Sequence, residues 1–555
     1  MSECYVHNSA SCLKGLINQI MDGEKIGFFV GAGISIQPPA SLPAAWEIKE
    51  KLLDALNPEN SASSAFSLFL KQMNDNSAKS PEAERLSEMM LEHILHLINE
   101  IDLNQNNQDE SLVYKAIRLL DIRQPDILRR RANHNHFTLA HLLIRNKIPI
   151  ILTTNFDWQI EDAYTELLPG HVCDRLIKLH GDIRDIESIK TTLPKVVAPL
   201  QGPHRRQLEE VLQKYSLCLV GYSGRDLDIS VVLKESESNE FYWLVHPNEK
   251  KERIDNLLAA YNAKRIHIIP YDLNLFLNRV GELNEFPSSN IDDSRPLSYD
   301  DHWSEWSHEL SQWQKTFVVG RLYQELGLRN DELRYFHASK NASTNCRERS
   351  LSLYRIGTAY LGERRSILAL FFLIRAYFSC GGSQSLILIK ASILRDIGDV
   401  VYRTGRKLGN SRIKLNILLF NIAKRLFKKS RELIEKRFDT KTTTDYDVLS
   451  VHGLILSHLG KVHRELFKFN DSVSYFNEAI NIADRYEAFN YWLHAEVLIH
   501  RAKTYLKMGS IEYENILADA NKALSMFKIL GNDEGIKYAD RICQEIKMIL
   551  NSVQE

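Results

Sequence analysis

Residues 25–37 have the sequence KIGFFVGAGISIQ, and this stretch decides the fold expected for the first half of the chain. A short apolar strand ends at Val30, and the turn GAGIS follows directly at residues 31–35. Glycines in such a turn let the backbone approach a diphosphate, and the N-terminus of the next helix offers free N–H groups. The third glycine of the common GxGxxG pattern is missing, so the turn taken alone could equally be structural.

Six short apolar runs with turn signals around them predict buried strands. They are Ile26–Val30, Ile148–Thr153, Leu176–Leu179, Leu217–Val220, Phe241–Val245 and Ile266–Ile269. Helical patterns separate the runs, for example at Trp46–Leu56, His136–Arg145 and Arg205–Tyr215. This alternation predicts an α/β fold with a doubly wound parallel sheet and helices on both faces. The long stretch between the first two strands predicts a helical insertion at about residues 57–135.

The chain has 555 residues, which is too many for one hydrophobic core, since single cores stop growing near roughly 250–300 residues. We expect a first domain at residues 1–285, a linker rich in Pro, Ser and Asp at 286–302, and an all-helical domain at 303–555. Helix breaks are expected at Gly327, Gly381-Gly382, Gly405, Gly460, Gly509 and Gly531. Ala479 and Ala523 stand where paired helices would touch closely, as in tetratricopeptide-type repeats. The spacing is irregular, so an irregular all-helical domain is the alternative.

Bulk composition argues against several classes of protein. The formal net charge is −1, so no global charge favours nucleic acid or a membrane surface. Seven dispersed cysteines without a CxxC pair indicate reduced thiols in a cytoplasmic protein, and no metal site is expected. We expect no signal peptide and no membrane span. The basic segment Arg403–Arg437 is interpreted as a solvated helix face, with nucleic acid or an acidic partner as the alternative.

Three more expected strands end in polar residues, at TTNFD (153–157), LHGD (179–182) and VGYSGRD (220–226). Ligands bind at the carboxyl ends of parallel strands, so these segments are candidates for one site. For Asn155 and Asp157 the alternative is capping of the next helix, and for Asp226 and Asp228 it is the same. A separate stretch, Arg129–Arg131 followed by NHNH at 133–136, is interpreted as structural, with His136 capping or packing on a helix.

The order GAGIS, TTNFD, LHGD and VGYSGRD resembles the sirtuin superfamily, most closely the sirtuin-like NAD-hydrolase domains of bacterial antiphage defence proteins. The resemblance covers about residues 10–280 and implies a six-stranded NAD-binding sheet. It implies that Asn155 contacts the reacting ribose and positions water, that Asp157 faces the nicotinamide carboxamide, and that His180 is the general base. The residues expected to bind NAD are Gly31, Ala32, Gly33, Ser35, Thr154, Gly221, Ser223 and Asp226.

Two departures from deacetylating sirtuins favour hydrolysis by water over deacylation. The chain has no cysteine pairs for a zinc ribbon, and IQPPASLPAAW follows the glycine turn in place of the family's acidic-aromatic-arginine run. The leading hypothesis is therefore an NAD⁺ hydrolase whose helical domain controls it, or assembles it into a homo-oligomer, until a phage-derived or cellular trigger binds. The alternatives are an NAD or ADP-ribose sensor without turnover, and a protein ADP-ribosyltransferase or deacylase.

Overall fold

The computed structural model describes two compact units, Met1–Leu310 and Ser311–Glu555. The described residues are 9–23, 26–59, 65–74, 80–102, 111–120, 132–185, 188–192, 195–196, 200, 202–236, 240–260, 266–286, 299–381, 386–408, 412–443, 445–485, 491–509, 513–529 and 532–554. The arginine run at 129–131, the expected breaks at Gly382 and Gly531, and most of the expected linker lie outside them.

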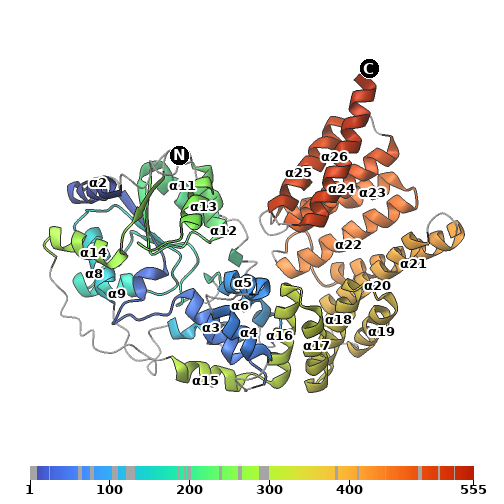
Figure 1. Cartoon of the computed structure of the whole chain (residues 1–555), viewed down its shortest axis with the longest axis horizontal. Coiled ribbons are helices and arrows are strands. Elements are labelled where there is room, and N and C mark those ends of the chain that lie inside the picture. Colours follow the sequence, from blue (N-terminus) through green and yellow to red (C-terminus); the bar gives the residue numbers. More distant parts are fainter. Residues whose placement is uncertain are drawn as a thin grey trace. The chain divides into compact units, whose positions relative to one another are not determined.

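The first unit is built on a six-stranded parallel sheet, as the sequence predicts (Figure 1). The strand order is β3-β2-β1-β4-β5-β6, and every neighbouring pair is parallel. This is the doubly wound order, in which the chain direction across the sheet reverses between β1 and β4. The strands are β1 Ile26–Val30, β2 Ile151–Thr153, β3 Leu176–Lys178, β4 Ser216–Val220, β5 Phe241–Val245 and β6 Ile266–Pro270.

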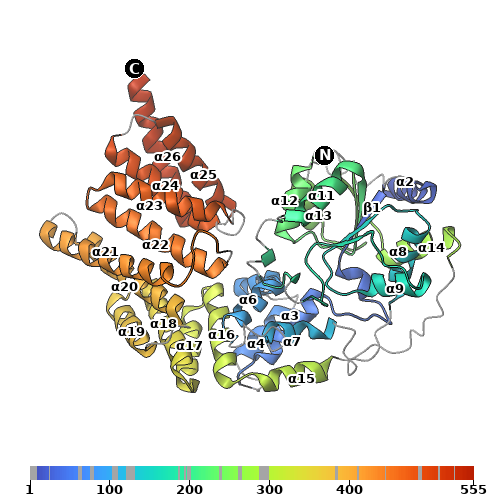
Figure 2. The same ribbon diagram turned by 180° about the vertical axis from the view of Figure 1, so that it is seen from behind.

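Alternate residues of each strand enter two separate cores, one on each face of the sheet. Phe28 and Val30 pack on one face, together with residues of α2 (Ser9–Asp22), α8 (His134–Ile144), α9 (Gln159–Leu167) and α14 (Leu273–Leu283). Phe29 packs on the other face with residues of α11 (Gly202–Lys214), α12 (Leu227–Glu235) and α13 (Lys251–Ala260). Figures 1 and 2 show these two groups of helices on opposite sides of the sheet. Burial on both faces explains why the strand sequences are almost continuously apolar.

The helices of the first unit divide into sheet-covering helices and an inserted group between β1 and β2. The sheet-covering helices are α2 Ser9–Asp22, α8 His134–Ile144, α9 Gln159–Leu167, α11 Gly202–Lys214, α12 Leu227–Glu235, α13 Lys251–Ala260 and α14 Leu273–Leu283. The inserted group is α3 Ala45–Ala55, α4 Ala65–Asn74, α5 Pro81–Glu88, α6 Leu91–Asn99, α7 Leu112–Ile117 and the 3-10 turn η3 Arg118–Leu120. Because α3 packs against α4 and α6, it belongs with this group, which starts before the expected residue 57.

Helix α15 (Asp300–Glu309) packs on the insertion, although the expected boundary placed residues from 303 onward in the helical domain. Trp306 is buried, and its indole N–H donates to the Leu112 carbonyl oxygen at 3.0 Å. The Ser307 hydroxyl donates to the Ala55 carbonyl oxygen at 3.0 Å. These contacts tie α15 to α7 and α3, so the first compact unit ends at Leu310.

The second unit contains helices that pair as successive hairpins. Each first helix of a hairpin also packs on the first helix of the next, which is the arrangement of a helical-repeat array. The first hairpin begins with a capping box of Ser311 and Gln314, and α16 ends at Gly327, which has a φ of 77°. The helices are α16 Gln312–Leu326, α17 Arg329–Ala342, α18 Cys346–Gly362, α19 Ser366–Ser379, α20 Ile387–Lys407, α21 Ile413–Glu435, α22 Tyr446–Glu465, α23 Phe469–Asp484, α24 Tyr491–Met508, α25 Tyr513–Ile529 and α26 Asp533–Gln554.

Two of the glycines expected to break helices lie inside helices, so that expectation is wrong for them. Gly405 lies in α20 and Gly460 in α22. A Cβ on Gly405 would lie 2.8 Å from the Phe420 ring, and one on Gly460 would lie 2.6 Å from the Phe476 ring. Each glycine thus makes room for a large side chain of the partner helix.

The same arrangement occurs at the first two hairpins of the array. A Cβ on Gly320 would lie 2.8 Å from Phe336, and one on Gly357 would lie 2.8 Å from Leu373. In every case the large side chain follows 15 or 16 positions after the glycine. This recurring pair, with the buried Ala479 and Ala523, indicates why the hairpins pack closely in spite of their irregular spacing. Within the described residues, no helix is long and apolar enough to cross a membrane.

Candidate functional site

A cavity of about 530 Å³ lies at the carboxyl ends of the central strands, within the range usual for small-molecule sites. It opens where the strand order reverses, which is where doubly wound sheets bind ligands. All eleven residues singled out from the sequence line it, namely Gly31, Ala32, Gly33, Ser35, Thr154, Asn155, Asp157, His180, Gly221, Ser223 and Asp226. The structure therefore brings the four motifs together at one cavity.

The turns after β1 and β4 touch each other at this edge. Gly31 donates its N–H to the Val220 carbonyl oxygen at 3.0 Å, and Gly33 donates to that of Gly221 at 3.1 Å. A Cβ on Gly31 would lie 2.4 Å from the Gly221 oxygen, so no side chain fits there. The expected helix N-terminus after the glycine turn is instead a single 3-10 turn, η1 Ala32–Ser35. The contact between the two turns therefore already requires these glycines, before any role in ligand binding is considered.

The N-terminus of α8 holds the glycine turn in place through NHNH at 133–136. Asn133 and Asn135 each donate a side-chain N–H to the Ile34 carbonyl oxygen, at 2.8 and 3.1 Å. His136 caps α8 as expected, because its Nδ1 accepts the Asn133 N–H at 3.0 Å. Burial lowers the pKa of His136 to about 3, so its ring is neutral at physiological pH.

A directed hydrogen-bond chain runs from His136 to Asp157. Since Nδ1 of His136 accepts, Nε2 carries the proton and donates to the Ser35 hydroxyl oxygen at 3.0 Å. The Ser35 hydroxyl in turn donates to Oδ2 of Asp157 at 3.5 Å. Oδ1 of Asp157 accepts the Gln159 N–H at 3.2 Å, so the alternative helix-capping role is present as well. Burial raises the pKa of Asp157, while the nearby Lys178 lowers it.

Asn155 presents an unsatisfied polar atom in the cavity. The residue is 8% exposed, and its amide nitrogen lies 3.4 Å from the Gly31 carbonyl oxygen. Its amide oxygen is buried and has no hydrogen-bond partner among the described residues. Buried polar atoms are nearly always hydrogen-bonded in proteins, so an orphaned oxygen in a cavity is evidence for a ligand donor there.

His180 is oriented by a carboxylate that the sequence reading left as a helix cap. Its Nε2 lies 3.1 Å from Oδ1 of Asp228, and the other oxygen of Asp228 accepts from Lys190 at 2.7 Å. Burial alone lowers the pKa of His180, but the hydrogen bond and charge of Asp228 outweigh it, so the pKa is raised. The same pairing lowers the pKa of Asp228 against the effect of burial.

This pair fixes the tautomer of His180. A carboxylate accepts only from N–H, so Nε2 carries the proton and Nδ1 has the lone pair when the ring is neutral. Nδ1 has no hydrogen-bond partner among the described residues. The neighbouring Asp226 precedes α12 but its side chain caps nothing. The arrangement gives a proton acceptor with a buried carboxylate behind it, as general bases commonly have.

Arginines lie beside Ser223 at another part of the cavity wall. Arg253 donates to the Ser223 carbonyl oxygen at 3.1 Å and pairs with Glu249 at 2.5 Å. Arg225 also lines the cavity and is exposed. Guanidinium groups suit phosphate oxygens, so this wall fits an anionic group. Neither arginine was singled out from the sequence, where single arginines in loops carry no distinguishing signal.

The helical insertion forms the remaining wall. Trp46 and Lys49 of α3 and Glu92 of α6 line the cavity. Lys49 is buried and donates to the carbonyl oxygens at the end of α5, those of Leu86, Ser87 and Met89. The sequence places Glu92 only as an acidic residue in the first turn of a helix, where such residues are favoured anyway.

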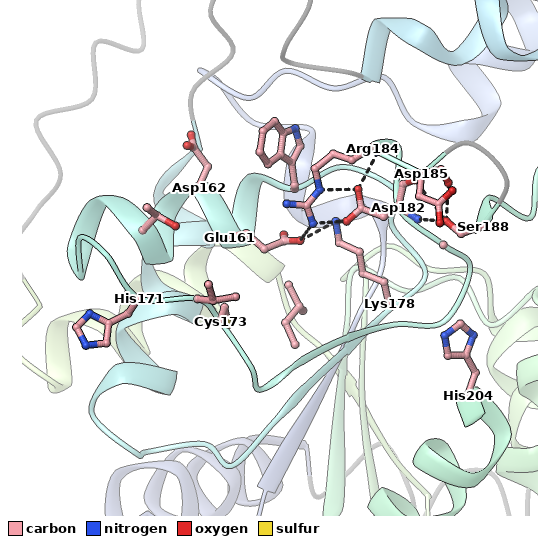
Figure 3. A pocket seen from close by; sticks show the side chains of 15 residues that line it. Glu161, Asp162, His171, Cys173, Lys178, Asp182, Arg184, Asp185, Ser188 and His204 are labelled. Atoms are coloured by element: carbon pink, nitrogen blue, oxygen red, sulfur yellow. Dashed lines mark hydrogen bonds and ion pairs between the residues drawn. The ribbon is translucent and has the colours of Figure 1, made fainter. Parts of the chain in front are cut away.

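A second cavity of about 530 Å³ is lined by Trp158 and Gly181, which directly follow Asp157 and His180 in the chain (Figure 3). In Figure 3, Lys178 points between Glu161 and Asp182, with nitrogen-to-oxygen distances of 2.8 and 2.9 Å. The ammonium of Lys178 also donates to the Asp157 carbonyl oxygen at 2.6 Å. The ion cluster therefore braces the backbone that presents Asp157 to the first cavity.

Two arginines of the basic segment pair with carboxylates of the second unit. In the basic segment, Arg403 pairs with Asp399 at 2.7 Å, and Arg431 pairs with Glu435 and Glu478. Glu435, Glu478 and the buried His452 are close enough to share a metal ion. Arg431 already bridges the two carboxylates, which disfavours a second cation there.

The structure thus has an α/β unit with a cavity at the carboxyl ends of its strands, followed by a helical-repeat array. A family model described as a SIR2-like domain matches residues 149–266, which contain Asn155, Asp157, His180 and the turn after β4. No curated protein matches the chain. One solved structure that matches is a signal transduction ATPase with numerous domains and a tetratricopeptide repeat sensor, from Pyrococcus horikoshii. The two chains are 11% identical over an alignment that covers 96% of this chain and 85% of that one, with a TM-score of 0.26.

Proposed function

We propose that this protein hydrolyses NAD⁺ to nicotinamide and ADP-ribose in the cavity lined by the four motifs. One observation carries the proposal. The orphaned amide oxygen of Asn155 lines the same cavity as His180, whose proton is fixed by a buried carboxylate. An acceptor that holds a hydroxyl or water, together with a proton acceptor, is what attack at a sugar carbon requires. The match of a SIR2-like domain over these residues supports NAD as the ligand.

The reaction balances with these groups alone. The bond between the ribose C1′ and the nicotinamide nitrogen breaks, and its electron pair neutralises the positive charge of the ring. The leaving group therefore needs no general acid. Water held by Asn155 adds to C1′ of the cationic sugar, and its proton passes to Nδ1 of His180. Transition states of this kind resemble an oxocarbenium ion, as in other glycosidic cleavages.

The charges lining the cavity match the charge pattern of the substrate. Three carboxylates, those of Asp157, Glu92 and Asp226, face it together with His180. Arg225 and Arg253 line it near Ser223. NAD⁺ carries a positive nicotinamide ring and a negative diphosphate, so both kinds of group have a counterpart.

The test is nicotinamide release from NAD⁺ by the full-length protein, in the wild type and in two variants. Asn155→Ala and His180→Ala should abolish release while leaving the thermal unfolding profile unchanged. Asp174→Asn, at an exposed position away from the cavity, serves as a matched control and should behave as the wild type. Turnover that survives in both cavity variants would refute the assignment, and ADP-ribose found attached to protein would point to transfer instead.

We further propose that the helical array controls the site through α15. This helix contacts α3 and α7 of the insertion, and the insertion forms one cavity wall. Only Leu310 and Ser311 separate α15 from α16, so a movement of the first hairpin would act on α15 directly. An unregulated NAD⁺ hydrolase would deplete its own cell. By the resemblance to antiphage proteins, the trigger is a phage-derived or cellular component. Helical arrays often mediate assembly, so the active form is a homo-oligomer. Mass photometry with and without NAD⁺ tests the assembly.

A further inference from the structure

Glu92 places a carboxylate in the cavity that the hydrolytic scheme does not use. It lies in the first turn of α6, on the insertion, and lines the cavity with Asn155 and His180. The charged groups that act on it are Asp226, His180 and Asp228, which all belong to the sheet side of the cavity. Its carboxylate makes no ion pair or hydrogen bond with another side chain in the described part of the chain.

Two other carboxylates at this edge of the sheet are already engaged. Asp157 accepts from the Ser35 hydroxyl and the Gln159 N–H, and Asp228 is held by His180 and Lys190. Glu92 has no such partner. A helix N-terminus favours an acidic residue. Glu84 occupies such a position in the first turn of α5, but it is exposed and does not line the cavity. The position of the helix end therefore does not explain why Glu92 is turned into the cavity.

Burial raises the pKa of Glu92, and the charges of Asp226 and Asp228 act in the same direction. Its own N–H and His180 act against them. An ionised carboxylate among other carboxylates is costly unless a cation reaches it. Carboxylates whose pKa is raised by burial and by neighbouring charges are common at functional sites. A bound cation would lower the cost and keep Glu92 ionised.

We propose that Glu92 recognises the positive charge of the substrate, first on the nicotinamide ring and then on the sugar as the bond breaks. The inference rests on the proposed NAD⁺ hydrolysis. It gives the insertion a direct part in the chemistry, because α6 then contributes the charge that separates the oxidised from the reduced dinucleotide. NADH has the same adenosine and diphosphate but no charge on the ring.

Calorimetry with uncleavable analogues measures this recognition without turnover. In carba-NAD⁺ and its reduced form, a methylene replaces the ribose ring oxygen, so that both stay intact. The wild type should bind the oxidised form more tightly than the reduced form. In Glu92→Gln this preference should fall about tenfold or more, as expected for loss of a charge-assisted contact. Binding of ADP-ribose, which lacks the ring, should stay unchanged. Glu84→Gln, at an exposed position in the first turn of α5, should keep the wild-type preference.

Kinetics supply the second measurement. Glu92→Gln should lower kcat for NAD⁺ by about tenfold or more, because electrostatic stabilisation of the transition state is typically worth ~10²-fold. An unchanged preference between the two analogues, or equal losses for ADP-ribose and carba-NAD⁺, would overturn the inference while leaving hydrolysis in place. If the wild type binds neither dinucleotide, the proposed function itself fails.

Discussion

Replacing Asp228 by Asn tests the assignment of His180 as the general base. The two side chains are 0% and 4% exposed, and their hydrogen bond is 3.1 Å long, so solvent does not screen the interaction. A hydrogen bond to a charged group contributes about 1.5–3 kcal/mol, which corresponds to roughly 10–150-fold in rate if the bond strengthens as His180 takes up the proton. We therefore expect kcat for nicotinamide release to fall within that range in Asp228→Asn.

The pH profile of Asp228→Asn should shift in a direction that a merely structural effect does not predict. The base must be neutral, so wild-type activity falls as the pH drops through the raised pKa of His180. Without the carboxylate, burial and the charge of Lys190 both lower that pKa. The acid limb of kcat/KM must then move to lower pH, and the imidazole titration followed by NMR must move with it.

Asp255→Asn, on the exposed surface of α13, is the control and should leave both curves unchanged. An acid limb that stays fixed or moves to higher pH in Asp228→Asn would refute the reasoning, even if the rate falls. Unfolding profiles of the two variants, recorded at the pH of the assay, separate a catalytic loss from a folding defect.

The remaining predictions concern packing, protonation and control. Gly460→Ala should destabilise the helical unit by up to ~2 kcal/mol, because overpacking against Phe476 outweighs the gain in helix propensity, whereas Gly15→Ala, with open space in α2, should stabilise by up to ~1 kcal/mol. Calorimetric unfolding checks both, and a gain at Gly460 would contradict the packing argument. The His136 ring should show no titration by NMR between pH 5 and 8, since burial lowers its pKa to about 3; a midpoint near 6.5 would show that the ring is not enclosed as described. Trp306→Phe removes the N–H bond to Leu112, a loss of about 1 kcal/mol, together with part of the buried ring, and should raise basal nicotinamide release if α15 restrains the site. Unchanged release, with Trp303→Phe as the matched control, would count against that route.

The sheet could be predicted from the sequence because its strands are buried on both faces. Continuous apolar runs such as Ile26–Val30 and Phe241–Val245 match the strands residue for residue. The second expected run, Ile148–Thr153, began three residues before the strand, which starts at Ile151, since Ile148 precedes Pro149 and does not join the ladder. The four motifs could be placed at one edge because parallel strands end on the same side.

The partner of His180 could not be found in this way. Asp228 follows β4, while His180 follows β3, and β2 and β1 lie between these strands. Only the strand order and the path of the following segments bring the two side chains together. Glu92 was missed because a first-turn acid has an adequate local explanation. The membership of α15 was missed because an amphipathic helix does not reveal which unit covers its tryptophans.

The glycine and large-side-chain pairs have a consequence for how the helical unit comes apart. Each pair holds the two helices of one hairpin close together, and among the described residues the extensive helix contacts join each hairpin to the next one along the chain. A substitution in one of these pairs should thus destabilise that hairpin and the two beside it, while distant hairpins keep their amide protons protected from exchange. Such an array can unfold locally when a partner binds, without unfolding as a whole. The hairpin that unfolds first is the one whose glycine and large-side-chain pair is weakest.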